Sequence, residues 1–108
     1  MIKLVAVYWR DIPAQVIGKA GRQTVKKVLP PRFAEAIDTA AMRAGRGRSD
    51  LYLSDWRRET RLCEGDLEQI VSEEAARLEG MFPPQELNRV VQANGLLSPR
   101  QPDPQGDA

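Results

Sequence analysis

The sequence predicts an α+β domain: a small, mostly antiparallel sheet of three or four strands, with two or three helices packed on one face. Two observations lead to this prediction. The chain opens with an apolar, β-branched run that breaks at Asp11 and Pro13 and then resumes, as the strands of a hairpin do. Later segments place apolar residues at helical spacing and are separated by proline and glycine.

Residues 2–10 form the first predicted strand. Its two alternating sets of side chains are both largely apolar, so we expect a central strand that is covered on both faces. Residues 14–19 are predicted as the second strand, and Gly18 and Gly21 weaken its end. Residues 22–29 also favour an extended conformation, and two interpretations stay open: a separate strand, or the continuation of one long, bent second strand.

The most regular helical pattern follows the stop at Pro30-Pro31. Proline is tolerated in the first turn of a helix, and Gly45 stands where a helix-ending glycine is usual. The apolar stripe of this helix consists of Phe33, Ala36, Ile37, Ala40, Ala41 and Ala44. After a glycine- and arginine-rich loop, Leu51-Tyr52-Leu53 predicts a further strand that reaches Trp56 or beyond.

A second helix is predicted over residues 66–79. Asp66 is a good N-cap, and Gln69 follows it in the register of a capping box. The apolar stripe of this helix contains one charged residue, Glu74. We therefore expect an amphipathic helix against the sheet, with a carboxylate inside its apolar face.

A third, short helix begins at Pro83-Pro84 and is closed by Asn94-Gly95. The sequence thus predicts one domain over residues 1–97. Residues 98–108 are rich in proline and polar side chains, and we expect them to form a disordered tail.

The composition excludes several classes of site. The 108 residues are 42% hydrophobic and 29% charged, which is typical of a globular domain. The chain has no histidine, so the usual general base and the commonest metal ligand are missing. A single cysteine, Cys63, rules out an internal disulfide and fits a reducing compartment. We expect a cytoplasmic protein with no membrane segment, no metal, no cofactor and no catalytic residue.

The charges are segregated along the chain. Residues 19–48 hold eight basic and two acidic residues, a net charge of +6, whereas residues 49–108 hold six basic and twelve acidic residues, a net charge of −6. The basic half invites a nucleic-acid interpretation, but a pI of about 7.9 and the lack of a known binding module argue against it. The glutamates of the second helix form either a solvated face or a contact for head-to-tail self-association or for a basic partner.

The main candidate for partner binding combines aromatic and cationic side chains. Trp9 and Arg10 end the first strand, and Trp56 and Arg57 repeat the pattern further along the chain. If their strands are neighbours, the two pairs together present an aromatic, cationic surface to a protein. The alternative is that both tryptophans are core residues, because buried indoles supply much of the apolar area of a small domain.

A weaker candidate is an anion site at Arg43, Arg46 and Arg48. Three guanidinium groups beside flexible glycine backbone suit a phosphate or carboxylate. However, these arginines follow the C-terminus of a predicted helix, where cations already compensate the helix dipole and anions are repelled.

Three sequence blocks are distinctive when they are read together. They are Val7–Val16, the helical segment Arg32–Gly45 and Asp50–Arg57. These blocks resemble a bacterial family known as "virulence factor". They are similar to the C-terminal domain of conserved virulence factor C proteins and to stand-alone α-proteobacterial chains. The resemblance covers about residues 2–80, and we expect residues 81–97 to be a helical extension outside the shared pattern.

The resemblance implies a role without a mechanism. The family has no assigned catalytic residues, so none can be transferred to this chain. Its members are similar to proteins whose genes are found beside the genes for methylenetetrahydrofolate reductase and corrinoid methyltransferase components. This gene neighbourhood implies an accessory subunit in one-carbon metabolism. The leading hypothesis is therefore a non-enzymatic subunit that docks on a larger cytoplasmic protein. The alternatives are a small protein or enzyme that binds an anionic, folate-like ligand, and a nucleic-acid-binding module.

Overall fold

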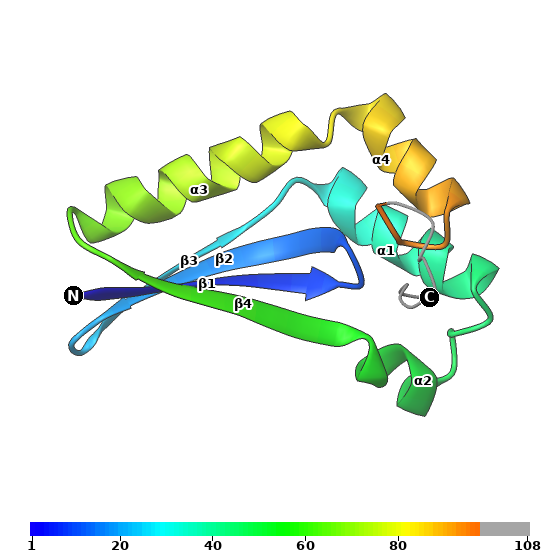
Figure 1. Cartoon of the computed structure of the whole chain (residues 1–108), viewed down its shortest axis with the longest axis horizontal. Helices are drawn as coiled ribbons and strands as arrows, with labels where there is room; N and C mark the ends of the chain where they lie inside the picture. Colours follow the sequence, from blue (N-terminus) through cyan, green and yellow to red (C-terminus); the bar gives the residue numbers. More distant parts are fainter. Residues whose placement is uncertain (98–108) are drawn as a thin grey trace, which may run out of the picture.

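The computed structural model describes residues 1–97 (Figure 1). Its strands form one antiparallel sheet with the order β3-β2-β1-β4. The predicted tail over residues 98–108 lies outside the described residues. The elements are β1 (Ile2–Trp9), β2 (Ile12–Ala20), β3 (Gln23–Val28), α1 (Pro31–Arg43), α2 (Ser49–Ser54), β4 (Trp56–Cys63), α3 (Leu67–Met81) and α4 (Pro84–Gln92).

The first strand is an inner strand, as its sequence predicts. It pairs with β2 on one side and with β4 on the other. A two-residue turn of Arg10 and Asp11 joins β1 to β2. The segment over residues 14–29 is divided between two strands, and Gly21 takes a φ of 60° in the turn between them. Glycine suits this turn because other residues rarely adopt positive φ.

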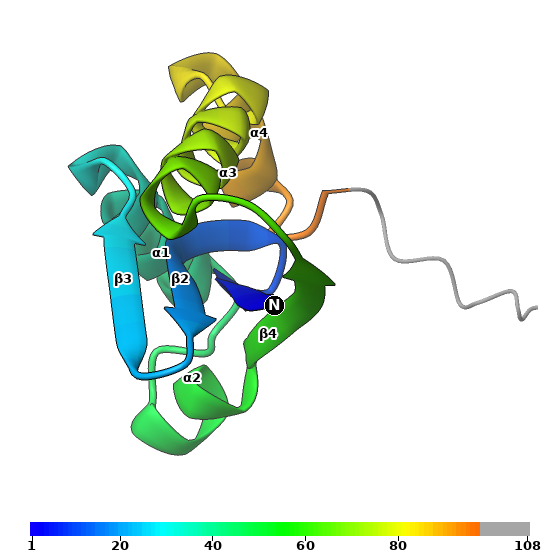
Figure 2. The same cartoon turned by 90° about the vertical axis from the view of Figure 1, so that its left-hand side faces the viewer.

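Helix α3 covers one face of the sheet and completes the main core (Figure 2). The helix comes close to β2 at Gly18, where a Cβ atom would stand 2.5 Å from Val71 Cγ2 and 2.8 Å from Leu67 Cδ1. Glycine in this strand therefore allows the helix to lie directly on the sheet. The buried side chains between the two layers include Leu4, Ala6, Val16, Val71, Ala75 and Leu78.

Helices α1 and α4 extend the core beyond the end of β1 (Figure 1). Arg32 at the start of α1 donates hydrogen bonds to the backbone carbonyls of Phe82 (3.1 Å) and Glu79 (3.3 Å). The rings of Phe33 and Phe82 meet edge to face, with centroids 6.2 Å apart. The beginning of α1 is thereby fixed to the junction of α3 and α4.

The prediction of a strand at Leu51-Tyr52-Leu53 is wrong. These residues belong to helix α2, and the strand begins only at Trp56. A short apolar run does not distinguish strand from helix by its periodicity, and tertiary contacts decide. Here the helical turn inserts the ring of Tyr52 between Trp9 and Trp56, with centroids 6.0 and 5.8 Å away. Residues 1–97 accordingly contain four helices, where two or three were expected.

The helix ends follow the predicted signals. The side chain of Asp66 accepts a hydrogen bond from the backbone N–H of Gln69 at 2.9 Å, so the predicted N-cap of α3 is confirmed. Asn94 and Gly95 follow α4 with φ values of 63° and 89°. None of the helices within residues 1–97 is long and apolar enough to cross a membrane.

The contact between α3 and β2 can be tested with two glycine substitutions. We expect Gly18→Ala to destabilise the domain by about 1–3 kcal/mol, because the added methyl group must displace Leu67 or Val71. Gly80→Ala is the matched control: Gly80 lies in α3 with open space around it, so alanine should stabilise by about 0.5 kcal/mol. Urea unfolding measures both changes. Effects of the same sign would contradict the close approach of helix and strand.

Candidate functional site

The β1–β2 turn is the point where distant parts of the chain meet. Arg10 has a φ of 54°, which residues other than glycine rarely adopt and which is costly unless the surroundings hold it. The backbone N–H of Arg10 donates to the carbonyl of Asp55 at 3.0 Å, and that of Asp11 to the carbonyl of Gly95 at 2.9 Å. The turn is thus fixed by the start of β4 and by the segment after α4.

Trp9 lies inside this arrangement and is fully buried. Its indole N–H donates to the carbonyl of Tyr52 at 3.0 Å, and the two rings stack. Gly95 closes the other side, since a Cβ atom there would stand 2.9 Å from the indole ring. Trp9 therefore takes the core role that was the alternative interpretation, and its ring is not available to a partner in this conformation.

Arg10 is engaged within the protein. Its guanidinium lies 5.2 Å from the Trp9 ring, donates to the carbonyl of Asn94 at 2.9 Å and pairs with Asp55 at 3.3 Å. Asp55 is shared with Arg46, whose Nε lies 2.7 Å from the same carboxylate. The side chain of Arg10 is only 19% exposed to solvent. These contacts make Arg10 a support for the turn.

Trp56 and Arg57 remain partly accessible at the start of β4. Trp56 packs edge to face against Tyr52 and borders two surface hollows, of about 610 and 260 Å³, that also share Gln15. The guanidinium of Arg57 lies 4.4 Å from the Tyr8 ring and donates to the carbonyl of Arg10 and to a carboxylate oxygen of Asp11. Of the two tryptophans, Trp56 is the one that a partner can reach.

The three arginines of the predicted anion site make separate contacts. Arg43 donates to the carbonyl of Gln92 at 3.2 Å, and Arg46 is paired with Asp55. Arg48 is exposed and precedes α2. The structure therefore directs Arg43 and Arg46 to different elements of the fold.

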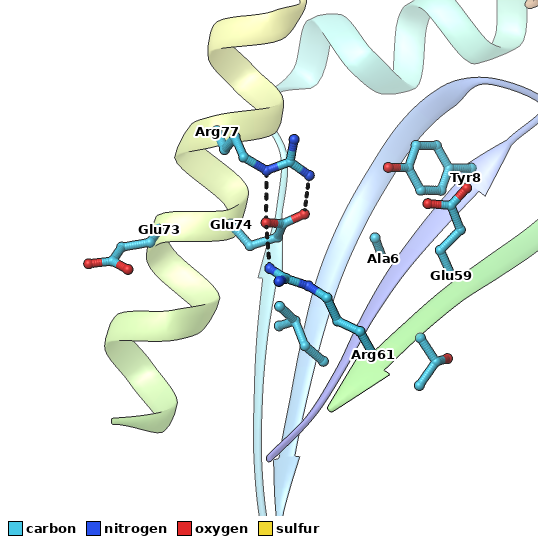
Figure 3. Close-up of a pocket in the computed structure, with 9 residues that line it drawn as sticks. Ala6, Tyr8, Glu59, Arg61, Glu73, Glu74 and Arg77 are labelled. Atoms are coloured by element: carbon cyan, nitrogen blue, oxygen red, sulfur yellow. Dashed lines mark hydrogen bonds and ion pairs between the residues drawn. The ribbon is translucent and has the colours of Figure 1, made fainter. Parts of the chain in front are cut away.

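A groove of about 580 Å³ separates β4 from α3 (Figure 3). Glu74 projects from α3 into this groove and is 7% exposed. It forms ion pairs with Arg77 at 2.6 Å and with Arg61 of β4 at 3.2 Å. The hydrogen bond from Arg77 lowers the pKa of Glu74 despite the opposing effect of burial, and the charge of Arg61 lowers it further. The groove is thus lined by a buried carboxylate that is paired with two arginines. Burial also raises the pKa of Tyr8, which lines the same groove.

A comparison with protein-family models matches most of this sequence to a known family. The family described as "Virulence factor" matches residues 7–91, from within β1 to near the end of α4. The chain belongs to the virulence factor family. The match extends past the boundary near residue 80 that we expected and includes most of α4. No curated protein and no solved structure matches the chain.

Sequence analysis did not assign a role in the site of this virulence factor domain to Tyr52, Tyr8 or Glu74. Tyr52 was assigned to a strand, although its ring contacts both tryptophans. Tyr8 was treated only as part of the first predicted strand, although its ring supports Arg57. Glu74 did leave a signal, because a charge inside an apolar helical stripe indicates a buried ion pair. Among residues 1–97, no group of histidine, cysteine, aspartate or glutamate has a geometry suited to a metal ion.

The role of Glu74 predicts a pH-dependent stability. Glu74→Gln should lower the melting temperature by about 5 °C at pH 7. The neutral amide can satisfy only part of the hydrogen bonding of Arg61 and Arg77, and because these two arginines are exposed, the loss costs only about 1 kcal/mol. The native pKa lies below the ordinary value of 4.5, so the stabilisation is complete above that pH and is lost as the pH falls through the native pKa. Thermal unfolding of both proteins between pH 7 and pH 3 measures the difference.

Glu73→Gln is the matched control for this experiment. Glu73 is the exposed neighbour on α3 and accepts a hydrogen bond from Gln69. Its substitution should change the melting temperature by less than about 2 °C at every pH. A Glu74→Gln deficit that stays constant down to pH 3 would show that the ion pairs are not its cause.

Proposed function

We propose that this virulence factor domain is a non-enzymatic accessory subunit that binds a larger protein, with Trp56 as the central contact. The observation behind this proposal is the position of Trp56, half-buried between two surface hollows. A tryptophan at the edge of a concave surface is the residue type that most often dominates binding energy at protein interfaces.

The surroundings of Trp56 support the proposal because they are already rigid. Its ring packs on Tyr52, which in turn stacks on the buried Trp9. Arg57, next to it, is oriented by Asp11 and by the Tyr8 ring. Side chains that are ordered before binding lose little conformational entropy on binding, so more of the contact energy becomes affinity.

The partner class in this proposal comes from the family resemblance. We propose a cytoplasmic enzyme of one-carbon metabolism, either a methylenetetrahydrofolate reductase or a corrinoid methyltransferase component. The contacts of Arg10, Arg43 and Arg46 favour docking over a folate-like ligand, since each guanidinium already has a protein acceptor.

Substitution of Trp56 tests the docking proposal. We expect Trp56→Ala to weaken binding to the partner enzyme about thirtyfold, which corresponds to the ~2 kcal/mol typical of an interface hot spot. Biolayer interferometry with the purified domain and each of the two candidate enzymes from the same organism measures the affinity. Circular dichroism establishes that the variant is folded, because Trp56 also contacts Tyr52.

Two further variants make this test specific. Gln15→Phe fills the hollows with an uncharged side chain, without removing an aromatic contact, and should also weaken binding. Met42→Ala, an exposed residue of α1 away from the hollows, should leave the affinity unchanged within twofold. Binding to neither enzyme would contradict the partner class. Binding that is insensitive to both Trp56→Ala and Gln15→Phe would contradict the site.

A further inference from the structure

The sheet has a second face, opposite α3, that the helices of residues 1–97 leave largely uncovered (Figures 1 and 2). Directly paired residues of antiparallel strands project to the same side, so the register identifies the members of this face. Three cross-strand rows form what we call the open face: Leu62, Lys3, Lys19 and Thr24; then Thr60, Val5, Ile17 and Lys26; then Arg58, Val7, Gln15 and Val28. Helices α1 and α2 border it only at the end where Gln15 and Val28 lie.

The open face has an aliphatic centre. Val5 and Val7 form its floor and are 3% and 8% exposed, whereas Leu62 and Val28 at its margins are 64% and 65% exposed. The sequence of β1 predicts burial on both sides, and α3 supplies the cover on only one of them. Val5 and Val7 are nevertheless buried, with Thr60, Ile17, Arg58 and Gln15 as their cross-strand neighbours. The apolar area that this face exposes to a partner comes from Leu62 and Val28, together with part of Ile17.

All charged side chains of the open face are basic. They are Lys3, Lys19, Lys26 and Arg58. None of the four forms an ion pair with another residue of the described chain, in contrast to the arginines at the β1–β2 turn and in the β4–α3 groove. Asp38 of α1 stands near the border, next to the smaller hollow. The face is therefore an aliphatic surface with unneutralised cations around it.

We propose that the open face is the docking surface of this domain and that the partner presents carboxylates around an aliphatic patch. This inference rests on the proposed function and specifies the chemistry of the partner. The larger hollow beside Trp56 belongs to the same surface, since Val7, Gln15 and Arg58 line it. Complementary charges would steer the encounter and select against basic surfaces, while the exposed side chains of Leu62 and Val28 and the accessible part of Ile17 would supply the apolar area that is buried on binding.

The side chains favour a protein over a nucleic acid. Single-stranded nucleic acids bind to sheets by stacking their bases on exposed aromatic rings. The open face exposes Leu62, Val28 and part of Ile17 instead, and Trp56 at its end is a single, partly exposed ring and not a row of aromatic side chains. Aliphatic side chains match a protein surface of the same kind, so the cations are expected to meet carboxylates.

The lysines of the chain provide an experiment that does not depend on a known partner. The sequence has four lysines, Lys3, Lys19, Lys26 and Lys27, and all are exposed. The first three project from the open face, whereas Lys27 pairs with Val16 and projects to the α3 side. Lysine acetylation followed by mass spectrometry reports the accessibility of each amine. The measurement compares the purified chain with the same chain in an extract of its own cells.

We expect acetylation of Lys3, Lys19 and Lys26 to fall at least fivefold in the extract, while that of Lys27 changes less than twofold. The protection should disappear in 0.5 M NaCl, which screens the ion pairs. Lys26→Glu should restore the reactivity of Lys3 and Lys19, and Lys27→Glu, with the same change in charge one residue away, should not. Leu62→Ser should also restore it, because it removes aliphatic contact area.

Several results would overturn the inference. Equal reactivity of all four lysines in the extract would show that the open face is free. Protection that nuclease treatment abolishes would assign the face to a nucleic acid, and protection in the concentrated pure chain would assign it to a second copy.

If a partner enzyme binds through Trp56 but the three lysines stay reactive, the proposed function stands and this inference fails. If the lysines are protected equally in Trp56→Ala, the open face stands and the role of Trp56 fails.

Discussion

The burial of Trp9 at the end of β1 is the constraint on which the remaining structure depends. A buried indole N–H needs an acceptor, and the carbonyl of Tyr52 supplies it only because residues 49–54 turn into a helix at that point. The ring also needs a close-fitting cover, and Gly95 provides it where a larger residue would collide. The position of Arg10 in the left-handed region follows from the same packing, since backbone bonds to Asp55 and through Asp11 hold the turn on both sides.

Most of the fold could be predicted because its signals are local. The apolar opening, the prolines before α1 and α4 and the cap at Asp66 each depend on neighbouring residues, and the structure contains the corresponding elements. The misassigned segment at Leu51-Tyr52-Leu53 is different, because its conformation is decided by two tryptophans far away along the chain. Three apolar residues in a row hold no periodicity, so sequence reasoning had nothing with which to choose.

The proximity of the two tryptophans was predictable, but the difference in their burial was not. Trp9 and Trp56 are paired across β1 and β4, as the interpretation of neighbouring strands requires. Trp9 is nevertheless buried, whereas Trp56 is partly accessible. The cations divide in a similar way: most of the arginines at the turn and the groove bind carboxylates or carbonyls, whereas the lysines form no ion pair within residues 1–97. This division follows side-chain chemistry, because a planar guanidinium suits fixed pairs and a hydrated ammonium suits a surface. Burial and pairing of this kind emerge only when strands and helices are placed in space.

The contacts that close the Trp9 environment have a consequence for how the domain is made. Arg10 binds the carbonyl of Asn94, and Asp11 accepts a hydrogen bond from the backbone N–H of Leu97, so these bonds span 84 and 86 residues. A ribosome releases the first strand long before residue 95 has been added. During synthesis the native cover of the indole therefore cannot be complete until residues 94–97 have emerged, so folding requires the end of the described chain to close onto its beginning.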